Sequence, residues 1–393
     1  MGCGRQPGRR LRNMNAEETL IRAALAAIRG DWKAAEAGFA SREPEAVVDW
    51  AIDHRLAALL HAHMPADSIW CERLRPARLQ ELACHLYRQT CIAKLLAAGR
   101  ERGIRFCAFK GLGIALVPTV YPAPALRPLG DLDLLVAPTD LDAAMDAARS
   151  IGFATLYPDP VVLAFEATEK NAVSLVHPQH GLLELHHYIR DDIPPDVTAR
   201  MLQRAVDIEA FGGRLGLLCP PDLLLALTVH AVTSDPGHPW VWLIELGLLA
   251  ETMTLGEWEL FERETGASGN ALYAIVVLET MARSLDWRVG PPGLPERLRR
   301  LLTARERRAL HRMGVVWPPT APHRDSLMLA RRLSGRPMHG RKSLWRTLWR
   351  HPGAICSEYR VRSGTVAFWR CRATDLARRV WRGARTATRK PET

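Results

Sequence analysis

The sequence predicts an α/β fold in which a small mixed β-sheet domain is flanked by N- and C-terminal helical regions. Three observations carry this prediction: alanine and leucine recur with helical spacing over 14–103, short β-type runs replace them over 104–218, and helical spacing returns over 219–310. With 393 residues and a hydrophobic fraction of 48%, the chain is long and apolar enough to bury a substantial core.

The N-terminal region, residues 14–103, contains apolar stretches such as "AVVDWAIDHRLAALLHAHM" and "RLQELACHLYRQTCIAKLLAAGRERG". Gly103 is a suitable end for the last of these helices. Residues 1–13 are expected to be a disordered leader, because Met14 offers a second start and Asn15 can cap the helix that follows.

The middle region, residues 104–218, is expected to form the small α/β domain. The β-type runs are "IRFCAF", "LDLLV", "AVSLVH" and "GLLELHHY". Between the second and third of them, residues 139–152 predict a helix that is capped by Thr139 and ended by Gly152.

The C-terminal helical region, residues 219–310, opens at Pro221 and Asp222 and precedes a basic tail rich in Trp and Arg, residues 311–393. The net charge of +11 comes from the end of this tail, because residues 331–393 hold 17 Lys and Arg against three acids. In "RKSLWRTLWR" apolar residues form one helical stripe with arginines around it. Such helices either pack on the body of the protein or contact an anionic partner such as a membrane surface, RNA or an acidic peptide.

Several protein classes are excluded. No stretch reaches the roughly 18 apolar residues that a membrane-spanning helix needs, and the basic start lacks the apolar segment of a secretory signal. The eight cysteines show no paired CxxC spacing, so neither a zinc site nor a disulfide framework is indicated. We therefore expect a cytoplasmic protein without a transmembrane segment.

The most informative stretch is "RPLGDLDLLVAP", residues 127–138, because it places two carboxylates beside buried leucines. In a strand, Asp131 and Asp133 project to the same side while Leu132 and Leu134 face the other way. Two carboxylates this close repel each other unless a cation compensates them. Mg²⁺ takes oxygen ligands and is usually bound by one or two carboxylates together with substrate phosphates, so this pair suits phosphoryl or nucleotidyl transfer.

Two further stretches strengthen this prediction. "FCAFKGLGIAL" reads as a strand, a turn at Lys110 and Gly111, and a short helix, which would direct a lysine and backbone amides at a phosphate. In "GLLELHHYIR", Glu184 and His186 share a face of a second strand, so Glu184 can supply a third carboxylate.

Each candidate also has a structural interpretation. Asp131 and Asp133 can be a turn or cap pair, Glu184 a surface residue and Lys110 a solvated loop residue, while Gly111 can serve the backbone conformation alone. Arg127 can bind a triphosphate or the acceptor, or it can pair with Asp131 or Asp140. His186 is a possible substrate contact or a core histidine, and a structural role is the alternative for the possible substrate residues His230 and His238.

The order "FKG", "RPLGDLDLLV", "ELHH" and "WVWLIELGLL" resembles the bacterial nucleotidyltransferase family of the polymerase-beta-like superfamily. Its members carry LKG, an arginine followed by a D-[IL]-D motif, and a strand ending in acid-x-His-Trp. The resemblance covers about residues 105–250 and is firmest over 106–136. The chain departs from the superfamily's usual Gly-Ser turn with Lys-Gly, and it has His187 and Glu245 where Trp and Asp are common.

The resemblance implies a nucleotidyltransferase fold and transfer of a nucleoside monophosphate from a triphosphate such as ATP, with release of pyrophosphate. It implies that Asp131, Asp133 and Glu184 are catalytic and bind two Mg²⁺ or Mn²⁺ ions, and that Gly111 and Lys110 hold the triphosphate. Similar proteins often occur beside genes for exopolysaccharide or lasso-peptide biosynthesis. This implies a small molecule, a sugar or a modified peptide as the acceptor.

Two other functions remain open at this point. One is a non-catalytic accessory protein that binds a nucleotide, a peptide or RNA, against which the intact "DLD" and the following acid argue. The other is a toxin-like enzyme that modifies tRNA, for which the basic tail is suited.

Overall fold

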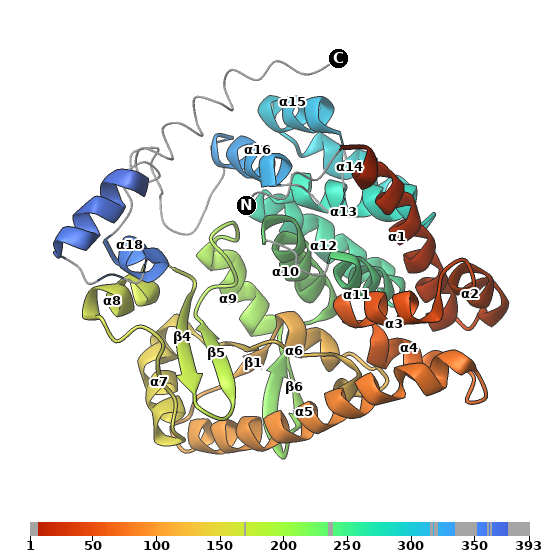
Figure 1. Cartoon of the computed structure of the whole chain (residues 1–393). Coiled ribbons are helices and arrows are strands. Elements are labelled where there is room, and N and C mark those ends of the chain that lie inside the picture. The colour runs from red at the N-terminus through yellow and green to blue at the C-terminus, as the bar shows by residue number, and fades with distance from the viewer. Residues whose placement is uncertain are drawn as a thin grey trace. The chain divides into compact units, whose positions relative to one another are not determined.

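The computed structural model (Figure 1) describes residues 7–168, 170–234, 239–314, 317, 321–334, 352–359, 361 and 364–375. It confirms the predicted α/β class, because the described residues form many helices and one mixed β-sheet. The chain forms two compact units, each assembled from three segments. The first contains residues 1–90, 110–129 and 219–336, and the second contains residues 91–109, 130–218 and 337–393.

The first unit is helical. Its N-terminal helices are α1 (Pro7–Ile28), α2 (Trp32–Phe39), α3 (Pro44–Asp53), α4 (Ala57–His63) and the first turns of α5 (Ile69–Arg100). Next come α6 (Lys110–Ala115), the 3₁₀ helix η1 (Pro124–Leu126), α10 (Pro220–Thr233) and α11 (Pro239–Glu251). The last are α12 (Leu255–Ser268), α13 (Ala271–Ser284), α14 (Leu294–Arg300), α15 (Ala304–Met313) and α16 (Ala321–Arg332). Trp240, Tyr273 and Phe261 are among the large side chains fully buried in it.

The second unit contains the sheet. Its seven described strands lie in the order β3 (Ala154–Thr155), β4 (Ala172–His177), β5 (Gly181–His186), β2 (Leu132–Leu135), β1 (Cys107–Ala108), β7 (Gly213–Leu217) and β6 (Val206–Ala210). The β2–β5 and β1–β7 pairs are parallel, and the other neighbours are antiparallel. Figure 1 shows β4 and β5 side by side as a hairpin, as their register requires.

The register of the central strands places the acidic residues next to each other. On β2 and β5, Asp133 is paired with Glu184, and Leu135 is paired with His186. Paired residues on neighbouring strands project to the same side of a sheet. Asp133 and His186 are buried, whereas Glu184 is partly exposed.

Helices η2 (Pro138–Asp140), α7 (Leu141–Ser150), α8 (Pro160–Thr168), α9 (Pro195–Arg204) and α18 (Pro352–Tyr359) complete the second unit. The helix predicted over 139–152 is present, but its N-cap is Asp140 and not Thr139, because a 3₁₀ turn comes first. Gly152 follows its end with a φ of +100°, a conformation that suits glycine.

The basic tail contributes to this unit. Val162 of α8 packs with Ile355, Cys356 and Phe368 in one apolar cluster. A Cβ atom on Gly353 would lie 2.4 Å from Cβ of Phe165, so α18 approaches α8 closely at this glycine. The predicted helical stripe over 341–350 lies outside the described residues, as do residues 1–6 of the expected leader, and α1 begins at Pro7.

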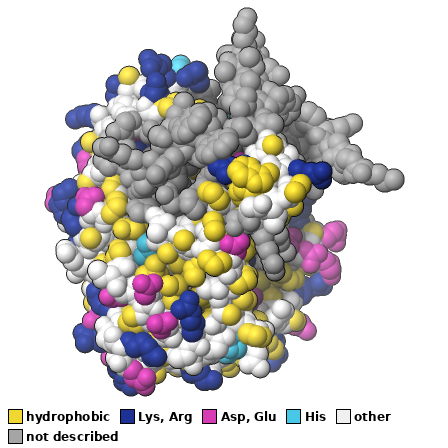
Figure 2. Space-filling view, turned by 90° about the vertical axis from the view of Figure 1, so that its left-hand side faces the viewer, with side chains coloured by type: hydrophobic (Ala, Val, Ile, Leu, Met, Phe, Trp, Pro, Cys, Tyr) yellow, Lys and Arg dark blue, Asp and Glu magenta, His cyan; other side chains and the backbone are white. Residues whose placement is uncertain are grey.

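Charged side chains of both signs are interspersed with apolar ones on the described surface seen in Figure 2. Among the described helices, none combines the length and the apolar character that crossing a bilayer requires.

Candidate metal centre

The candidate centre is a cluster of Asp133, Glu184 and His186 in the second unit. One possible ligand atom from each lies within 4.8 Å of the others, and no other group of three or more His, Cys, Asp or Glu of this kind occurs among the described residues. Strand β2 supplies Asp133, while β5 supplies Glu184 and, two residues later on the same face, His186. The predicted alternation places Glu184 and His186 on one face of β5, and the pairing of β2 with β5 brings Asp133 to them.

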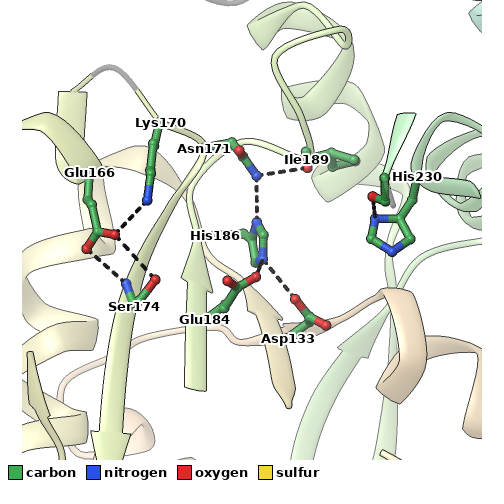
Figure 3. A network of polar contacts seen from close by, with 10 residues as sticks. Asp133, Glu166, Lys170, Asn171, Ser174, Glu184, His186, Ile189 and His230 are labelled. Carbon is green, nitrogen blue, oxygen red and sulfur yellow. Dashed lines mark hydrogen bonds and ion pairs between the residues drawn. The ribbon is translucent and has the colours of Figure 1, made fainter. Parts of the chain in front are cut away.

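Figure 3 shows the imidazole of His186 between the two carboxylates. Its Nε2 lies 2.9 Å from Oδ1 of Asp133 and 3.2 Å from Oε2 of Glu184. The side chains of His186 and Asp133 are only 1% and 5% exposed, whereas that of Glu184 is 27% exposed. Glu184 is therefore the member of the cluster that solvent or a substrate can reach.

Neighbouring residues hold the ring of His186 on its other sides. Nδ2 of Asn171 lies 3.0 Å from Nδ1 of His186, and the ring of Phe109 meets the imidazole edge-on with 4.6 Å between ring centres. Asn171 directly precedes β4, and its carbonyl oxygen accepts a hydrogen bond from the backbone N–H of His187. No pattern in the sequence indicates Asn171, because only the pairing of β4 with β5 places it beside the histidine.

Next to the cluster, Ser174 of β4 is paired with Glu184 in the sheet. The backbone N–H and the hydroxyl of Ser174 donate to the buried carboxylate of Glu166, which also pairs with Lys170 at 2.9 Å (Figure 3). Glu166 is thus compensated by donors of its own within the described residues. It supports β4 from helix α8.

Asp131, the other predicted metal ligand, directly precedes β2 and is half-buried. The cluster of possible ligand atoms adds His186 to the predicted residues Asp133 and Glu184. The donor set fits a divalent cation, because two carboxylates a short distance apart offer oxygen ligands and a concentrated negative charge.

The residues predicted to hold a triphosphate lie in the first unit. Lys110 is buried and opens helix α6 with a φ of +50°, an uncommon conformation for a residue with a side chain. Gly111 lies close to the guanidinium of Arg127, since a Cβ atom there would be 2.7 Å from Nη1. Strained backbone often occurs at functional positions. The positive φ of Lys110 could not be predicted from the Lys-Gly sequence alone.

Arg127 is paired with Glu245 of α11 inside the first unit. Its Nε lies 2.8 Å from Oε1 and its Nη2 lies 3.4 Å from Oε2 of Glu245, and both side chains are buried. Tyr121 donates its hydroxyl to the same carboxylate at 2.8 Å, and burial, followed by the charge of Glu245, raises the pKa of this phenol well above its ordinary value. Glu245 is therefore the buried partner of two donors, Arg127 and Tyr121.

The remaining candidates are the histidines of the C-terminal helical region. His230 lies on α10, where its Nδ1 is 3.0 Å from Oγ of Ser234 and its ring packs against Trp242 with 4.7 Å between ring centres. Through these contacts His230 packs within the first unit. His238 lies outside the described residues.

Comparison with known proteins places these observations in a family. The crystal structure of an antigenic nucleotidyltransferase-like protein from Paracoccidioides brasiliensis is similar at 15% sequence identity and a TM-score of 0.34, over 53% of this chain and 96% of that one. No curated protein matches the chain. Residues 40–283 match a family described as "Uncharacterised nucleotidyltransferase". Because this match covers more than half of the sequence, the chain belongs to that family of nucleotidyltransferases.

Proposed function

We propose that the protein transfers a nucleoside monophosphate from a nucleoside triphosphate to an acceptor and releases pyrophosphate. The observation that carries this proposal is the pairing of Asp133 with Glu184 on adjacent parallel strands, with His186 against both carboxylates. The family supports nucleotidyl transfer, and the carboxylate pair supports dependence on a divalent cation.

Asp133 and Glu184 are the residues that would hold Mg²⁺ or Mn²⁺, and Asp131, two residues before Asp133, is proposed as a further ligand. A divalent cation bound there would neutralise charge on the triphosphate and on the attacking oxygen. Two such ions are proposed, as in other enzymes that carry out displacement at phosphorus.

The chain's own residues have separate roles in this proposal. An acceptor hydroxyl attacks the α-phosphorus, an oxygen–phosphorus bond forms, and the bond from that phosphorus to the bridging oxygen of the β-phosphate breaks. Glu184, the more exposed carboxylate, receives the proton of the hydroxyl, while the buried Asp133 is proposed to serve only as a ligand of the cation. Lys110 and Gly111 are proposed to bind the triphosphate, with Lys110 supplying positive charge.

The acceptor is proposed to be a small molecule, a sugar or a peptide that carries a hydroxyl or a phosphate. The test is incubation of the protein with each α-labelled nucleoside triphosphate, Mg²⁺ or Mn²⁺, and fractions of a cell lysate. Label should pass to one species with wild-type protein and not with Asp133→Asn. Asp142→Asn, which makes the same change on the exposed side of α7, should leave the transfer intact.

If Asp142→Asn also loses transfer, the loss in Asp133→Asn would reflect a general disturbance of the folded protein and not a role of Asp133 in the site. Label on tRNA would favour the toxin-like enzyme over a biosynthetic one. The absence of transfer with every triphosphate and every fraction would contradict the proposal and favour a binding protein.

A further inference from the structure

The side chain of Asn171 has only one orientation that satisfies its surroundings. Its Nδ2 lies 3.0 Å from Nδ1 of His186 and 3.3 Å from the carbonyl oxygen of Ile189 (Figure 3). An amide nitrogen carries two hydrogens and accepts no hydrogen bond, so it donates to both atoms. The reversed amide would place its oxygen against the carbonyl oxygen of Ile189, where two acceptors repel each other.

This orientation determines where the proton of the neutral imidazole lies. Nδ1 of His186 accepts from Asn171 and therefore carries no hydrogen, which leaves the hydrogen on Nε2. Nε2 is the atom that lies 2.9 Å from Asp133 and 3.2 Å from Glu184. The ring thus directs a donor, and not a lone pair, at the two carboxylates.

A histidine that binds a metal has the opposite arrangement. It gives the lone pair of one nitrogen to the ion and donates the hydrogen of the other to a carbonyl or a carboxylate. Here the group that faces the second nitrogen of His186 is itself a donor. The surroundings of His186 therefore do not match those of a metal ligand, although its distance to the carboxylates does.

We propose that His186 is a positioning residue, which Asn171 holds with its hydrogen on Nε2 so that it bridges Asp133 and Glu184 and stays outside the coordination of the cation. The cation is then bound by oxygen ligands alone, and the site favours Mg²⁺ over ions such as Zn²⁺ that prefer imidazole. This inference rests on the proposed function, because it concerns the same carboxylates.

The first test is nuclear magnetic resonance on metal-free protein labelled with ¹⁵N-histidine, in which protonated and unprotonated ring nitrogens give distinct signals. The signals of His186 are identified because they are absent from the spectrum of His186→Asn. They should show a protonated Nε2 and an unprotonated Nδ1. Addition of Mg²⁺ should leave this pattern unchanged. A protonated Nδ1, or loss of the hydrogen from Nε2 when Mg²⁺ is added, would overturn the inference.

The second test replaces the hydrogen-bond donor that faces Nδ1 of His186 with an acceptor. Asn171→Asp supplies an acceptor, so Nδ1 should become protonated and Nε2 should become available to a metal. Affinity for Zn²⁺, measured by competition with a chelator, should then rise at least about tenfold, the effect typical of a partner that orients a ligand histidine. Affinity for Mg²⁺ should change less than that for Zn²⁺.

Two control variants complete this design. Thr168→Asp adds the same charge at an exposed position three residues earlier and should leave the preference between Zn²⁺ and Mg²⁺ unchanged. Asn171→Leu removes the donor without adding an acceptor and should not raise the affinity for Zn²⁺. If Asn171→Asp changes the affinity for Zn²⁺ no more than Thr168→Asp does, Asn171 does not determine which ring nitrogen of His186 carries the hydrogen. The first test needs neither nucleotide nor turnover, so the inference can fail while nucleotidyl transfer stands.

Discussion

At the scale of single residues, the two carboxylates differ in how far they are buried. The side chain of Asp133 is 5% exposed and that of Glu184 is 27% exposed, although they are direct neighbours in the sheet. Burial disfavours a charged carboxylate unless a partner compensates it, and His186 contacts both. Asp133 is therefore suited to a fixed role, whereas Glu184 can also meet an acceptor.

The difference predicts the behaviour of Glu184→Gln. Glutamine keeps the size and a side-chain oxygen that can accept from His186, but it cannot take a proton from the acceptor hydroxyl. Turnover should fall at least about a hundredfold, as expected for the loss of a general base. Triphosphate affinity should stay within a few fold, because Asp131 and Asp133 are proposed to hold one cation with the triphosphate without Glu184. Steady-state kinetics and calorimetry measure the two quantities.

Glu209→Gln is the matched control, because Glu209 is an exposed carboxylate on β6 of the same sheet. It should leave both quantities unchanged. Turnover that survives Glu184→Gln would place the base elsewhere. A large loss of triphosphate affinity in that variant would show that Glu184 acts in binding and not mainly in the chemical step.

At the scale of elements, the alternating patterns were enough to predict which residues share a face. They placed Glu184 and His186 together on one strand, and the structure confirms that these side chains meet. The neighbouring position of β2 and β5 was expected from the resemblance and is confirmed, but the alternation alone could not establish it, because α7, β3, α8 and β4 lie between these strands in the sequence. Asn171 was missed for the same reason, since its contact with His186 depends on which strands are neighbours.

The pair of Arg127 and Glu245 shows a similar limit of sequence reasoning. The two residues are 118 positions apart, and nothing in the local pattern of either α11 or the segment before β2 indicates the other. Removing one member of a buried ion pair leaves the other charge buried and uncompensated. This contact links α11 to the connection that follows η1 within the first unit.

We expect Arg127→Met to lower the free energy of unfolding by about 3–5 kcal/mol, because Glu245 would keep a buried charge with Tyr121 as its remaining neutral donor. Adding Glu245→Gln to this variant should restore much of the loss, since the charge is then gone. Denaturant unfolding measures both. Arg283→Met, which removes an exposed arginine from Glu279, should cost less than about 1 kcal/mol.

An unchanged stability in Arg127→Met, together with weaker triphosphate binding, would contradict this account. It would support the prediction from sequence that Arg127 binds the triphosphate. A double variant as unstable as Arg127→Met alone would show that the arginine stabilises the unit by packing, including its position 5.5 Å from the ring of Trp242, and not by its charge.

At the scale of the whole molecule, the fold class and the helical and β-rich regions could be predicted, but the division into compact units could not. Each unit combines segments that are distant in the sequence, and the second includes part of the basic tail. Its helix α18 packs on α8 through the cluster around Ile355. For this part of the tail, packing on the body of the protein is the interpretation that the structure supports.

The carboxylates of β2 and β5 are proposed to bind a divalent cation together with a nucleoside triphosphate. Without the cation, Asp133 and Glu184 should repel the phosphates, because like charges at close range destabilise each other. Titration calorimetry of the wild-type protein with a nucleoside triphosphate, in Mg²⁺ and in a chelator, tests this directly. Affinity for the triphosphate should be at least about tenfold higher in Mg²⁺, whereas equal affinity under the two conditions would show that no cation joins these carboxylates to the nucleotide.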